Sequence, residues 1–231
     1  MINPISREQA VIALLDAWPW EFETTLIGGY ALAAYGAARY SDDIDFVLPA
    51  ASKKPIEDWL REREFVEAKR KGATSRQTFE GATRLERNEI TIDLLDGFVR
   101  DREAGVDVPE AWIALRPRRV RLDLLSGSVR TRVRVARPEA LWALKLQAGR
   151  DQDITDLFAI RNEPVKVSEV RSLFESLKSD GLASKLRKVE SKLGTPKLYN
   201  DSRSRLGLKD TEASQVMWRT FRDRVREMLP P

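Results

Sequence analysis

The chain of 231 residues carries 40 Lys and Arg against 36 Asp and Glu, and it contains no His and no Cys. These two absences exclude Ser-His-Asp and Cys-His catalysis, disulfide bonds and the usual ligands of a structural zinc ion. An enzyme of this composition has to use carboxylates, Lys, Arg, Tyr, hydroxyls and backbone amides. Because carboxylates prefer hard cations, Mg²⁺ or Mn²⁺ is the expected cofactor.

Hydrophobic content and its distribution along the chain further limit the possible classes of protein. With 42% hydrophobic residues, the chain can bury the core of one or two domains. Its longest apolar runs fall far short of the roughly 20 residues that span a bilayer. The N-terminal sequence MINPISREQ lacks the basic and apolar pattern of a signal peptide. We therefore expect a cytoplasmic protein without a membrane partner.

Charge is distributed unevenly along the chain. Residues 1–60 are acidic and the remainder is basic, although the formal net charge is only +4. Eight arginines lie in one short basic segment: Arg116, Arg118, Arg119, Arg121, Arg130, Arg132, Arg134 and Arg137. This segment is typical of a surface that binds a polyanion, and it is equally compatible with a well-solvated surface.

The first part of the chain alternates between helix and strand patterns. Residues 6–18 predict a helix that begins with a capping box of Ser6 and Gln9. The patterns that follow predict a strand at 24–27, a short helix at 30–35, a strand at 44–48, a helix at 55–63, strands at 65–68, 77–79 and 90–95, a helix at 109–115, and strands at 120–124 and 129–135.

From residue 138 onward the pattern is helical. It predicts helices at 139–148, 152–161, 168–179, 182–193 and 211–228. Strands mixed with helices and then an all-helical tail predict an α+β fold. We expect a mixed β-sheet with flanking helices over residues 1–137, followed by a helical domain over residues 138–231.

Two aspartates open an otherwise apolar strand. Asp43 and Asp45 flank Ile44, so the period of two places both carboxylates on one face. Burying two such charges without a partner costs several kcal/mol, and a divalent cation removes that cost. Two ions about 4 Å apart could hold the attacking and leaving oxygens of a phosphoryl transfer. An isolated pair of this kind is usually two solvated surface acids, so its sequence neighbours decide the interpretation.

The neighbours of this pair favour a phosphoryl-transfer site. Gly28-Gly29, about fifteen residues upstream, follows a predicted strand and precedes a predicted helix, where a backbone can approach an anion closely. A third carboxylate could come from Asp93 or from Asp123, since each lies between apolar residues. We rank Asp93 first, because it lies on the next long strand and its run is more strongly apolar.

The stretch LIGGYALAAYGAARYSDDIDFVLP, residues 26–49, resembles the nucleotidyltransferase signature of the DNA polymerase β superfamily. In that signature a strand, a glycine turn and a short helix precede an Asp-x-Asp pair, and a later strand supplies a third Asp. The fuller pattern is similar to the small prokaryotic branch that includes AbiEii-type toxins and related toxin–antitoxin nucleotidyltransferases. A second block in residues 138–156, with Lys145 followed by Arg150, Asp153 and Asp156, resembles the helical signature of the same branch.

The resemblance implies roles for individual residues. Asp43, Asp45 and Asp93 would bind the metal, and Asp93 would also activate the acceptor hydroxyl. Lys145 would neutralise phosphate charge, whereas its helical pattern alone is more typical of a solvated lysine. The residues implied to hold the nucleotide are Gly28, Gly29, Tyr30, Arg39, Ser41 and Lys145.

Two further expectations concern supporting residues. Tyr30 stands where many members of the superfamily have Ser or Thr, so we expect a weakened phosphate contact at that position. Asp153 and Asp156 lie one helical turn apart, and we expect them to hold Arg39 or Arg150 in place rather than to bind metal.

The resulting hypothesis is a Mg²⁺- or Mn²⁺-dependent nucleotidyltransferase of the polymerase-β type. It would transfer a nucleoside monophosphate from an NTP to an acceptor hydroxyl and release pyrophosphate, by positioning and charge neutralisation. The Arg-rich segment favours an RNA acceptor, such as a tRNA end. The branch implies a role in a toxin–antitoxin system or in phage defence, with a cognate antitoxin as a further partner.

Two alternatives stay open at this point. The acceptor hydroxyl could belong to a protein or to a small molecule such as an antibiotic. The protein could also be a non-catalytic member of the fold that binds RNA or protein. The presence of all three acids argues against a non-catalytic protein.

Overall fold

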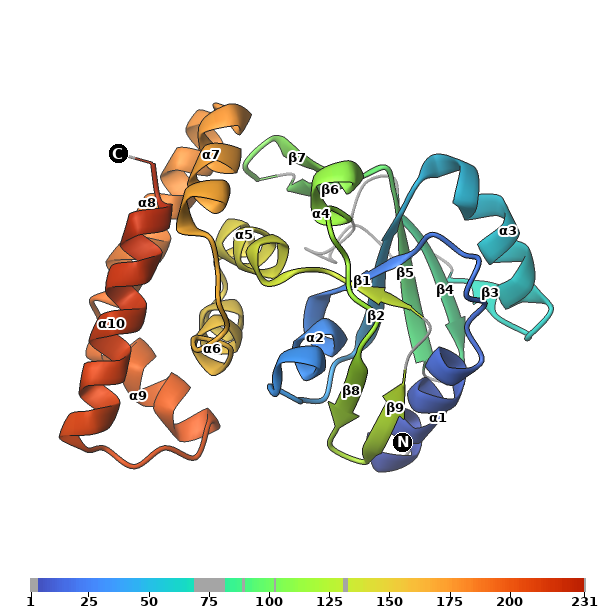
Figure 1. Ribbon diagram of the computed structural model, residues 1–231, viewed down its shortest axis with the longest axis horizontal. Coiled ribbons are helices and arrows are strands. Elements are labelled where there is room, and N and C mark those ends of the chain that lie inside the picture. The colour runs from blue at the N-terminus through green and yellow to red at the C-terminus, as the bar shows by residue number, and fades with distance from the viewer. Residues whose placement is uncertain (1–3, 69–81, 89, 102, 131–132, 231) are drawn as a thin grey trace. The chain divides into compact units, whose positions relative to one another are not determined.

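The computed structural model describes residues 4–68, 82–88, 90–101, 103–130 and 133–230. The chain packs as two compact units (Figure 1), which are Met1–Arg100 with Val108–Arg137, and Asp101–Asp107 with Pro138–Pro231. No helix in the described ranges is long and apolar enough to cross a membrane. The expected division at residue 137 into two separate domains stays a prediction.

Unit 1 is built around a six-stranded mixed sheet in the order β10-β1-β2-β5-β4-β3. Its strands are β1 Thr25–Ile27, β2 Asp43–Leu48, β3 Val66–Glu67, β4 Ala82–Arg87, β5 Ile90–Asp96 and β10 Arg134–Val135. Strand β2 lies at the centre, parallel to β5 and antiparallel to β1, and β4 pairs antiparallel with the far side of β5. Asp45 therefore lies between Ile27 of β1 and Asp93 of β5, and Asp43 is paired with Thr91 of β5.

Aromatic packing covers one face of this sheet. Helix α1 (Pro4–Asp16) leads to Trp18, whose ring lies 4.4 Å from that of Phe46 on β2. Helix α3 (Ala50–Arg61) adds Trp59, whose ring centroid is 5.2 Å from that of Trp18. Because strand side chains alternate, the packing of Phe46 on this face turns Asp43 and Asp45 to the opposite face.

Short elements complete unit 1. They are α2 Gly28–Ala31, the 3₁₀ helix η1 Leu32–Tyr35, α4 Glu110–Ile113, and the paired strands β8 Arg121–Leu124 and β9 Gly127–Arg130. The paired strands β6 Phe98–Asp101 and β7 Val106–Pro109 belong partly to each unit, because Asp101–Asp107 is assigned to unit 2. The β8–β9 hairpin buries Leu122, Leu124 and Val129 and exposes the alternating residues between them. This alternation turns the charged side chains of the hairpin to solvent.

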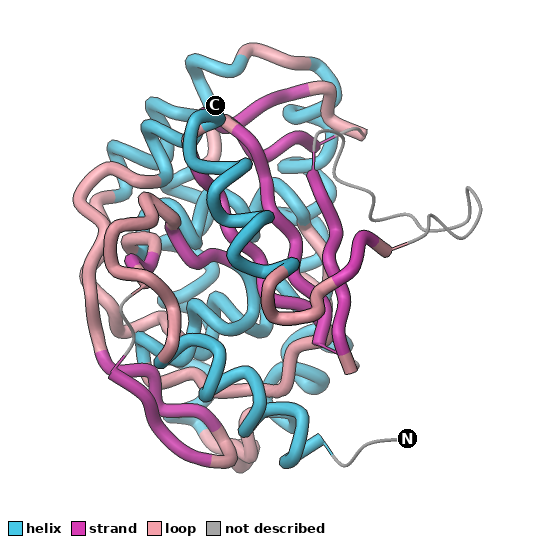
Figure 2. The backbone as a smooth tube through the Cα atoms, turned by 90° about the vertical axis from the view of Figure 1, so that its right-hand side faces the viewer, coloured by secondary structure: helices cyan, strands magenta, loops and turns pink. Residues whose placement is uncertain are grey.

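Unit 2 is helical after residue 137 (Figure 1), and Figure 2 draws the helices of the whole chain in cyan. Its helices are α5 Pro138–Ala148, α6 Asp151–Ala159, α7 Val167–Leu177, α8 Asp180–Leu193, α9 Pro196–Arg205 and α10 Glu212–Met228. Trp218 and Phe221 of α10 pack on Phe158 of α6, with ring centroids 5.0 and 5.3 Å away. The predicted fold, a mixed sheet with flanking helices followed by helices, is confirmed.

The tip of the β6–β7 hairpin packs within unit 2. Lys185 of α8 pairs with Asp101 at 2.6 Å, and the Ser179 hydroxyl donates a 2.5 Å hydrogen bond to the Ala104 carbonyl. Gly181 lies so close that a Cβ there would be 2.8 Å from the same carbonyl oxygen. Only glycine at this helix start lets the hairpin backbone approach the first turn of α8.

Several predicted boundaries were wrong. Helix α1 begins at Pro4 rather than at Ser6, so Ser6 is inside the helix and does not cap it. Pro is favourable at the first helical position, because it has no N–H to leave without a partner. Helix α3 begins at Ala50, so Pro55 lies in its interior. The predicted helix start at residue 55 is therefore five residues too late.

Several elements of the structure were not predicted from the sequence. Strand β4, the β6–β7 pair and helix α9 were not predicted, and the strand predicted at 129–135 is divided between β9 and β10. Helix α9 did have a local signal, since Thr195 caps it and Pro196 is its first residue. Strand β4 has few apolar residues, and Leu85 is its one buried residue. The strand predicted at 77–79 lies outside the described residues.

Candidate active site

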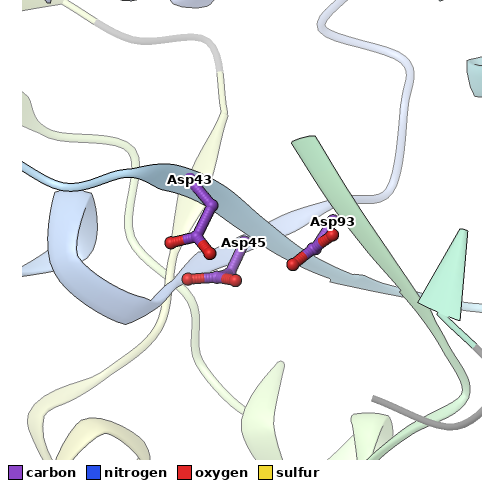
Figure 3. A group of neighbouring side chains, drawn as sticks. All are labelled: Asp43, Asp45 and Asp93. Atoms are coloured by element: carbon purple, nitrogen blue, oxygen red, sulfur yellow. The ribbon is translucent and has the colours of Figure 1, made fainter. Parts of the chain in front are cut away.

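The structure brings three aspartates together on one face of the sheet (Figure 3). In the parallel pairing of β2 with β5, Asp45 lies directly opposite Asp93, and Asp43 is two residues earlier on the same strand. One carboxylate oxygen from each of the three lies within 4.8 Å of the others. Among the described residues this is the one group of three acids close enough to share a cation.

Asp123, the rival third carboxylate, is elsewhere. It lies on the exposed face of the β8–β9 hairpin, where its carboxylate is 2.7 Å from Arg121 Nε and its side chain is 65% exposed. Asp93 is 2% exposed on the strand next to the pair. Both residues have apolar neighbours in sequence, so strand pairing and not local pattern separates them.

Arg84 holds the third carboxylate and was missed by sequence reasoning. It lies opposite Asp93 in the pairing of β4 with β5. Its Nε and Nη2 donate to the two oxygens of Asp93 at 2.7 and 2.5 Å, and Nη2 also lies 3.4 Å from Asp43. The hydrogen bond with Asp93 is the main reason that the pKa of Arg84 lies above its ordinary value. Arg84 therefore brings a permanent positive charge to the acidic group.

The glycine turn packs against the acid pair. Gly28 has φ +69°, and a Cβ at this position would lie 2.0 Å from Asp45 Oδ2. A Cβ on Gly29 would lie 2.4 Å from Ser41 Oγ and 3.0 Å from Arg39 Nη2. The structure thus places Gly28 beside the acid pair, and Gly29 beside Ser41 and Arg39. The four residues around the acid pair were each predicted to belong to the nucleotide site: Gly28, Gly29, Arg39 and Ser41.

We expect Gly28→Ala to reduce catalytic efficiency at least about a hundredfold. The added methyl overlaps the Asp45 carboxylate, and a displacement near 1 Å at a reacting centre costs about that much. The matched control is Gly36→Ala, because Gly36 has φ +72° but nothing within 4 Å of its Cβ position. Steady-state kinetics should show a large loss for Gly28→Ala alone. Similar losses in both variants would mean that backbone strain, and not contact with Asp45, is responsible.

The Tyr30 side chain is directed to the backbone of the segment that precedes Asp43. Its side chain is buried, and its hydroxyl donates to the Ser41 carbonyl at 3.3 Å. Burial raises the pKa of Tyr30 to about 12. Arg7 of α1 donates to the same carbonyl at 2.7 Å. Both side chains thus contact the segment that leads into Asp43, and the weakened phosphate contact expected at Tyr30 stays a prediction.

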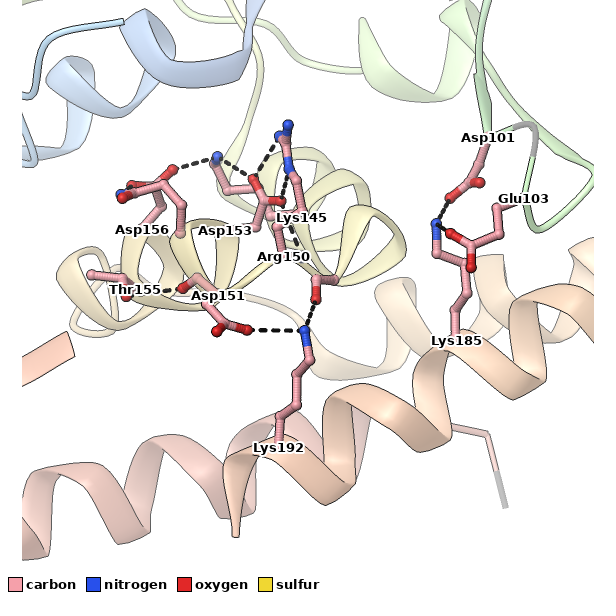
Figure 4. Close-up of polar contacts among 12 residues, drawn as sticks. Asp101, Glu103, Lys145, Arg150, Asp151, Asp153, Thr155, Asp156, Lys185 and Lys192 are labelled. Atoms are coloured by element: carbon pink, nitrogen blue, oxygen red, sulfur yellow. Dashed lines mark hydrogen bonds and ion pairs between the residues drawn. The ribbon is translucent and has the colours of Figure 1, made fainter. Parts of the chain in front are cut away.

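Lys145 is buried in an ion-pair cluster of unit 2 (Figure 4). Its ammonium lies 3.2 Å from Asp153 and 2.6 Å from Asp156, and all three side chains are at most 7% exposed. Arg150 binds Asp153 through Nε and Nη2 at 2.6 and 3.1 Å. Asp153 therefore holds Arg150, as expected, whereas Asp156 accepts hydrogen bonds from Lys145 and Gln152. A solvated Lys145 was the wrong alternative, and its predicted contact with phosphate stays a prediction.

The cluster predicts a pH dependence of stability. Burial has the largest effect on the pKa of Asp153 and would raise it, but the hydrogen bond of Arg150 and the charges of Lys145 and Arg150 together lower it. A lowered folded pKa stabilises the fold above the unfolded value, about 3.9, and this contribution is lost as the pH falls through the folded pKa. Below about pH 4, urea unfolding should therefore show a steeper loss of stability for the wild type than for Asp153→Asn. Parallel losses would contradict this assignment.

The chain was compared with curated proteins and with solved structures. No curated protein matches the sequence. Among solved structures, the chain is similar to ANT(2″)-Ia in complex with adenylyl-2″-tobramycin, at 16% identity and a TM-score of 0.37 over 95% of this chain and 97% of that chain. It is also similar to JHP933 from Helicobacter pylori, at 14% identity and a TM-score of 0.45 over 97% and 94% of the two chains.

The candidate site thus combines two aspartates that open a strand, a third on its parallel neighbour and a glycine turn against the pair. The family model described as "Nucleotidyl transferase AbiEii toxin, Type IV TA system" matches residues 14–231. The chain therefore belongs to the AbiEii family of nucleotidyltransferase toxins. The resemblance seen in the sequence is confirmed, and the protein is a nucleotidyltransferase.

Proposed function

We propose that this protein uses a divalent cation, Mg²⁺ or Mn²⁺, to transfer a nucleoside monophosphate from an NTP to a hydroxyl of RNA, such as a tRNA end. The observation that carries the proposal is the approach of the Asp43, Asp45 and Asp93 carboxylates to within 4.8 Å of one another. Three carboxylates at this separation suit a hard cation, and they would otherwise repel one another. The bound cation would neutralise charge on the phosphates.

The residues of the chain would orient the reaction. Asp43 and Asp45 would hold the cation that binds the triphosphate. Gly28 and Gly29, which have no side chains, would let the backbone lie directly beside the triphosphate. The acceptor oxygen would form a bond to the α-phosphorus, the bond from that phosphorus to the bridging oxygen would break, and pyrophosphate would leave. The proton of the acceptor hydroxyl would pass to Asp93. With no histidine in the chain, a carboxylate is the suitable proton acceptor.

Exposed arginines of unit 1 favour RNA as the acceptor. In the basic segment, the side chains exposed to solvent are Arg116, Arg118, Arg119, Arg121 and Arg130. Arg121 and Arg130 lie opposite each other on the β8–β9 hairpin. Arg119 bonds the backbone of Trp20, whose side chain is 63% exposed and could stack on a base.

The remaining arginines of the segment have other surroundings. Arg137 is buried against the Trp112 ring, and Arg134 lies 3.5 Å from Glu23. Arg132 lies outside the described residues. The structure thus divides the basic segment into an exposed part that suits a phosphate backbone and a part engaged in packing.

The experiment is a transfer assay with each α-labelled NTP. Total tRNA, a lysate protein fraction and an aminoglycoside are offered in parallel, with Mg²⁺, Mn²⁺ or EDTA. We expect label on RNA, dependence on the cation, and a loss of RNA affinity of about a hundredfold or more between 50 and 200 mM salt if five arginines contact phosphates. Label on the protein or antibiotic alone would overturn the RNA acceptor and leave the enzyme class intact.

The family also suggests a biological setting. Its description as the toxin of a Type IV toxin–antitoxin system supports a cognate antitoxin as a genetic partner, and a role in growth control or phage defence. Expression of the wild type and of Asp45→Asn in separate cultures tests this part of the proposal. Growth arrest by the wild type alone is the expected result, and equal growth of both cultures would contradict a toxin role.

A further inference from the structure

The positively charged Arg84 side chain lies against two of the three aspartates of the proposed metal site, Asp93 and Asp43. Its guanidinium binds both oxygens of Asp93, and Nη2 reaches to 3.4 Å from Asp43 Oδ2. The two acids it contacts come from different strands, β5 and β2. A cation that bridged these two acids would have to lie close to the guanidinium, and the two positive charges would repel each other.

The side chains of this pair differ in their freedom to move. Asp93 is 2% exposed and lies in the middle of the sheet, whereas the Arg84 side chain is 40% exposed. Long arginine side chains keep a flexible stem beneath a charged head at such positions. If the contact opens, the arginine is the partner that can move into solvent, while Asp93 stays beside Asp45.

We propose that Arg84 is an internal counter-cation that competes with the divalent cation for Asp93. It offsets part of the negative charge of the three acids in the metal-free protein, and it gives up its contact with Asp93 when the cation binds. Arg84 is thus a positioning residue that lowers the affinity of the free protein for metal. This inference rests on the proposed metal site of Asp43, Asp45 and Asp93.

A purely structural arginine predicts the opposite effect. If Arg84 only oriented Asp93 for metal binding, its removal would weaken binding or leave it unchanged. If Arg84 competes, its removal strengthens binding, because three carboxylates then face the cation without a rival charge. The sign of the change in metal affinity therefore separates the two roles.

The test measures Mn²⁺ binding to the full chain without nucleotide, from the electron paramagnetic resonance signal of free Mn²⁺. Arg84→Gln should bind Mn²⁺ at least about tenfold more tightly than the wild type. Arg121→Gln is the matched control, because Arg121 also pairs with an aspartate in unit 1 but at a distance from the three acids. It should bind Mn²⁺ as the wild type does, and Asp45→Asn should lose most binding.

A second readout covers the stability of the variant. In EDTA, Arg84→Gln should melt at a lower temperature than the wild type, because it leaves like charges together, and Mn²⁺ should raise its melting temperature by more. If Arg84→Gln does not fold, Arg84→Lys decides, since lysine keeps the charge without the two-pronged bond. It should bind Mn²⁺ a few times more tightly than the wild type, and equal or weaker binding overturns the inference.

The outcomes also distinguish a failure of this inference from a failure of the proposed metal site. If the wild type binds Mn²⁺, Asp45→Asn does not, and Arg84→Gln binds no more tightly than the wild type, the metal site stands and competition by Arg84 is wrong. If neither the wild type nor Arg84→Gln binds Mn²⁺, both the metal site and the inference are wrong.

Discussion

Asp45→Asn is expected to reduce nucleotidyl transfer at least about a thousandfold, which corresponds to about 4 kcal/mol of lost transition-state stabilisation. Asn has nearly the same shape, so the strand and its packing on β1 and β5 should persist. Asn lacks the negative charge with which Asp45 would hold the cation. Asp45 lies between Gly28 and Asp93, so this charge is lost at the centre of the candidate site. Single-turnover transfer of labelled NMP to the acceptor measures the effect.

The control for this variant is Asp123→Asn. It makes the same chemical change at an exposed aspartate of unit 1 that is paired only locally with Arg121. Activity of Asp123→Asn should stay within about twofold of the wild type. A loss comparable to that of Asp45→Asn would place Asp123, and not Asp93, in the catalytic group, and equal activity of Asp45→Asn and wild type would refute the assigned site.

Lys145→Met is expected to destabilise the protein by about 3–5 kcal/mol. Removing one partner of a buried ion pair leaves the other charge without compensation, and Asp153 and Asp156 are 1% and 3% exposed. Urea unfolding measures the loss. Lys197→Met, the same change at an exposed lysine of α9, should alter stability by no more than about 0.5 kcal/mol.

A second variant separates structure from catalysis at Lys145. In Lys145→Met/Asp156→Asn the remaining charge is smaller, so part of the lost stability should return. If Lys145 also neutralises phosphate charge, transfer activity should stay low in this more stable double variant. Recovery of activity along with stability would restrict Lys145 to a structural role, and unchanged stability in Lys145→Met would contradict the importance of the buried cluster.

The local pattern around the acid pair was predicted well for a physical reason. A strand, a glycine turn and an alternating Asp-x-Asp are properties of neighbouring residues, and the period of two alone places Asp43 and Asp45 on one face. The helical tail was predicted for the same reason, since apolar residues at helical spacing lie close together in sequence. Helix α9 was missed although its capping residues were present.

Long-range pairing could not be read from those patterns. Leu122-Asp123-Leu124 and Ile92-Asp93-Leu94 look alike in sequence, and only the register of β5 on β2 sets Asp93 beside Asp45. The sequence pattern did not indicate Arg84, because strand β4 is poor in apolar residues. Arg84 comes to lie beside Asp93 only through the pairing of β4 with β5. The burial of Lys145 likewise depends on the arrangement of α5 and α6.

The absence of histidine and cysteine was visible at once, and it limited the chemistry to carboxylates, hard cations and backbone amides. The sequence by itself determined this chemistry, the glycine turn and the acid pair, because each depends on composition or on residues a few positions apart. Only the tertiary structure decided which acid lies beside the pair, which arginine holds it and where the Tyr30 and Lys145 side chains lie. Those contacts join residues from separate elements, and their geometry is set by strand register and helix packing.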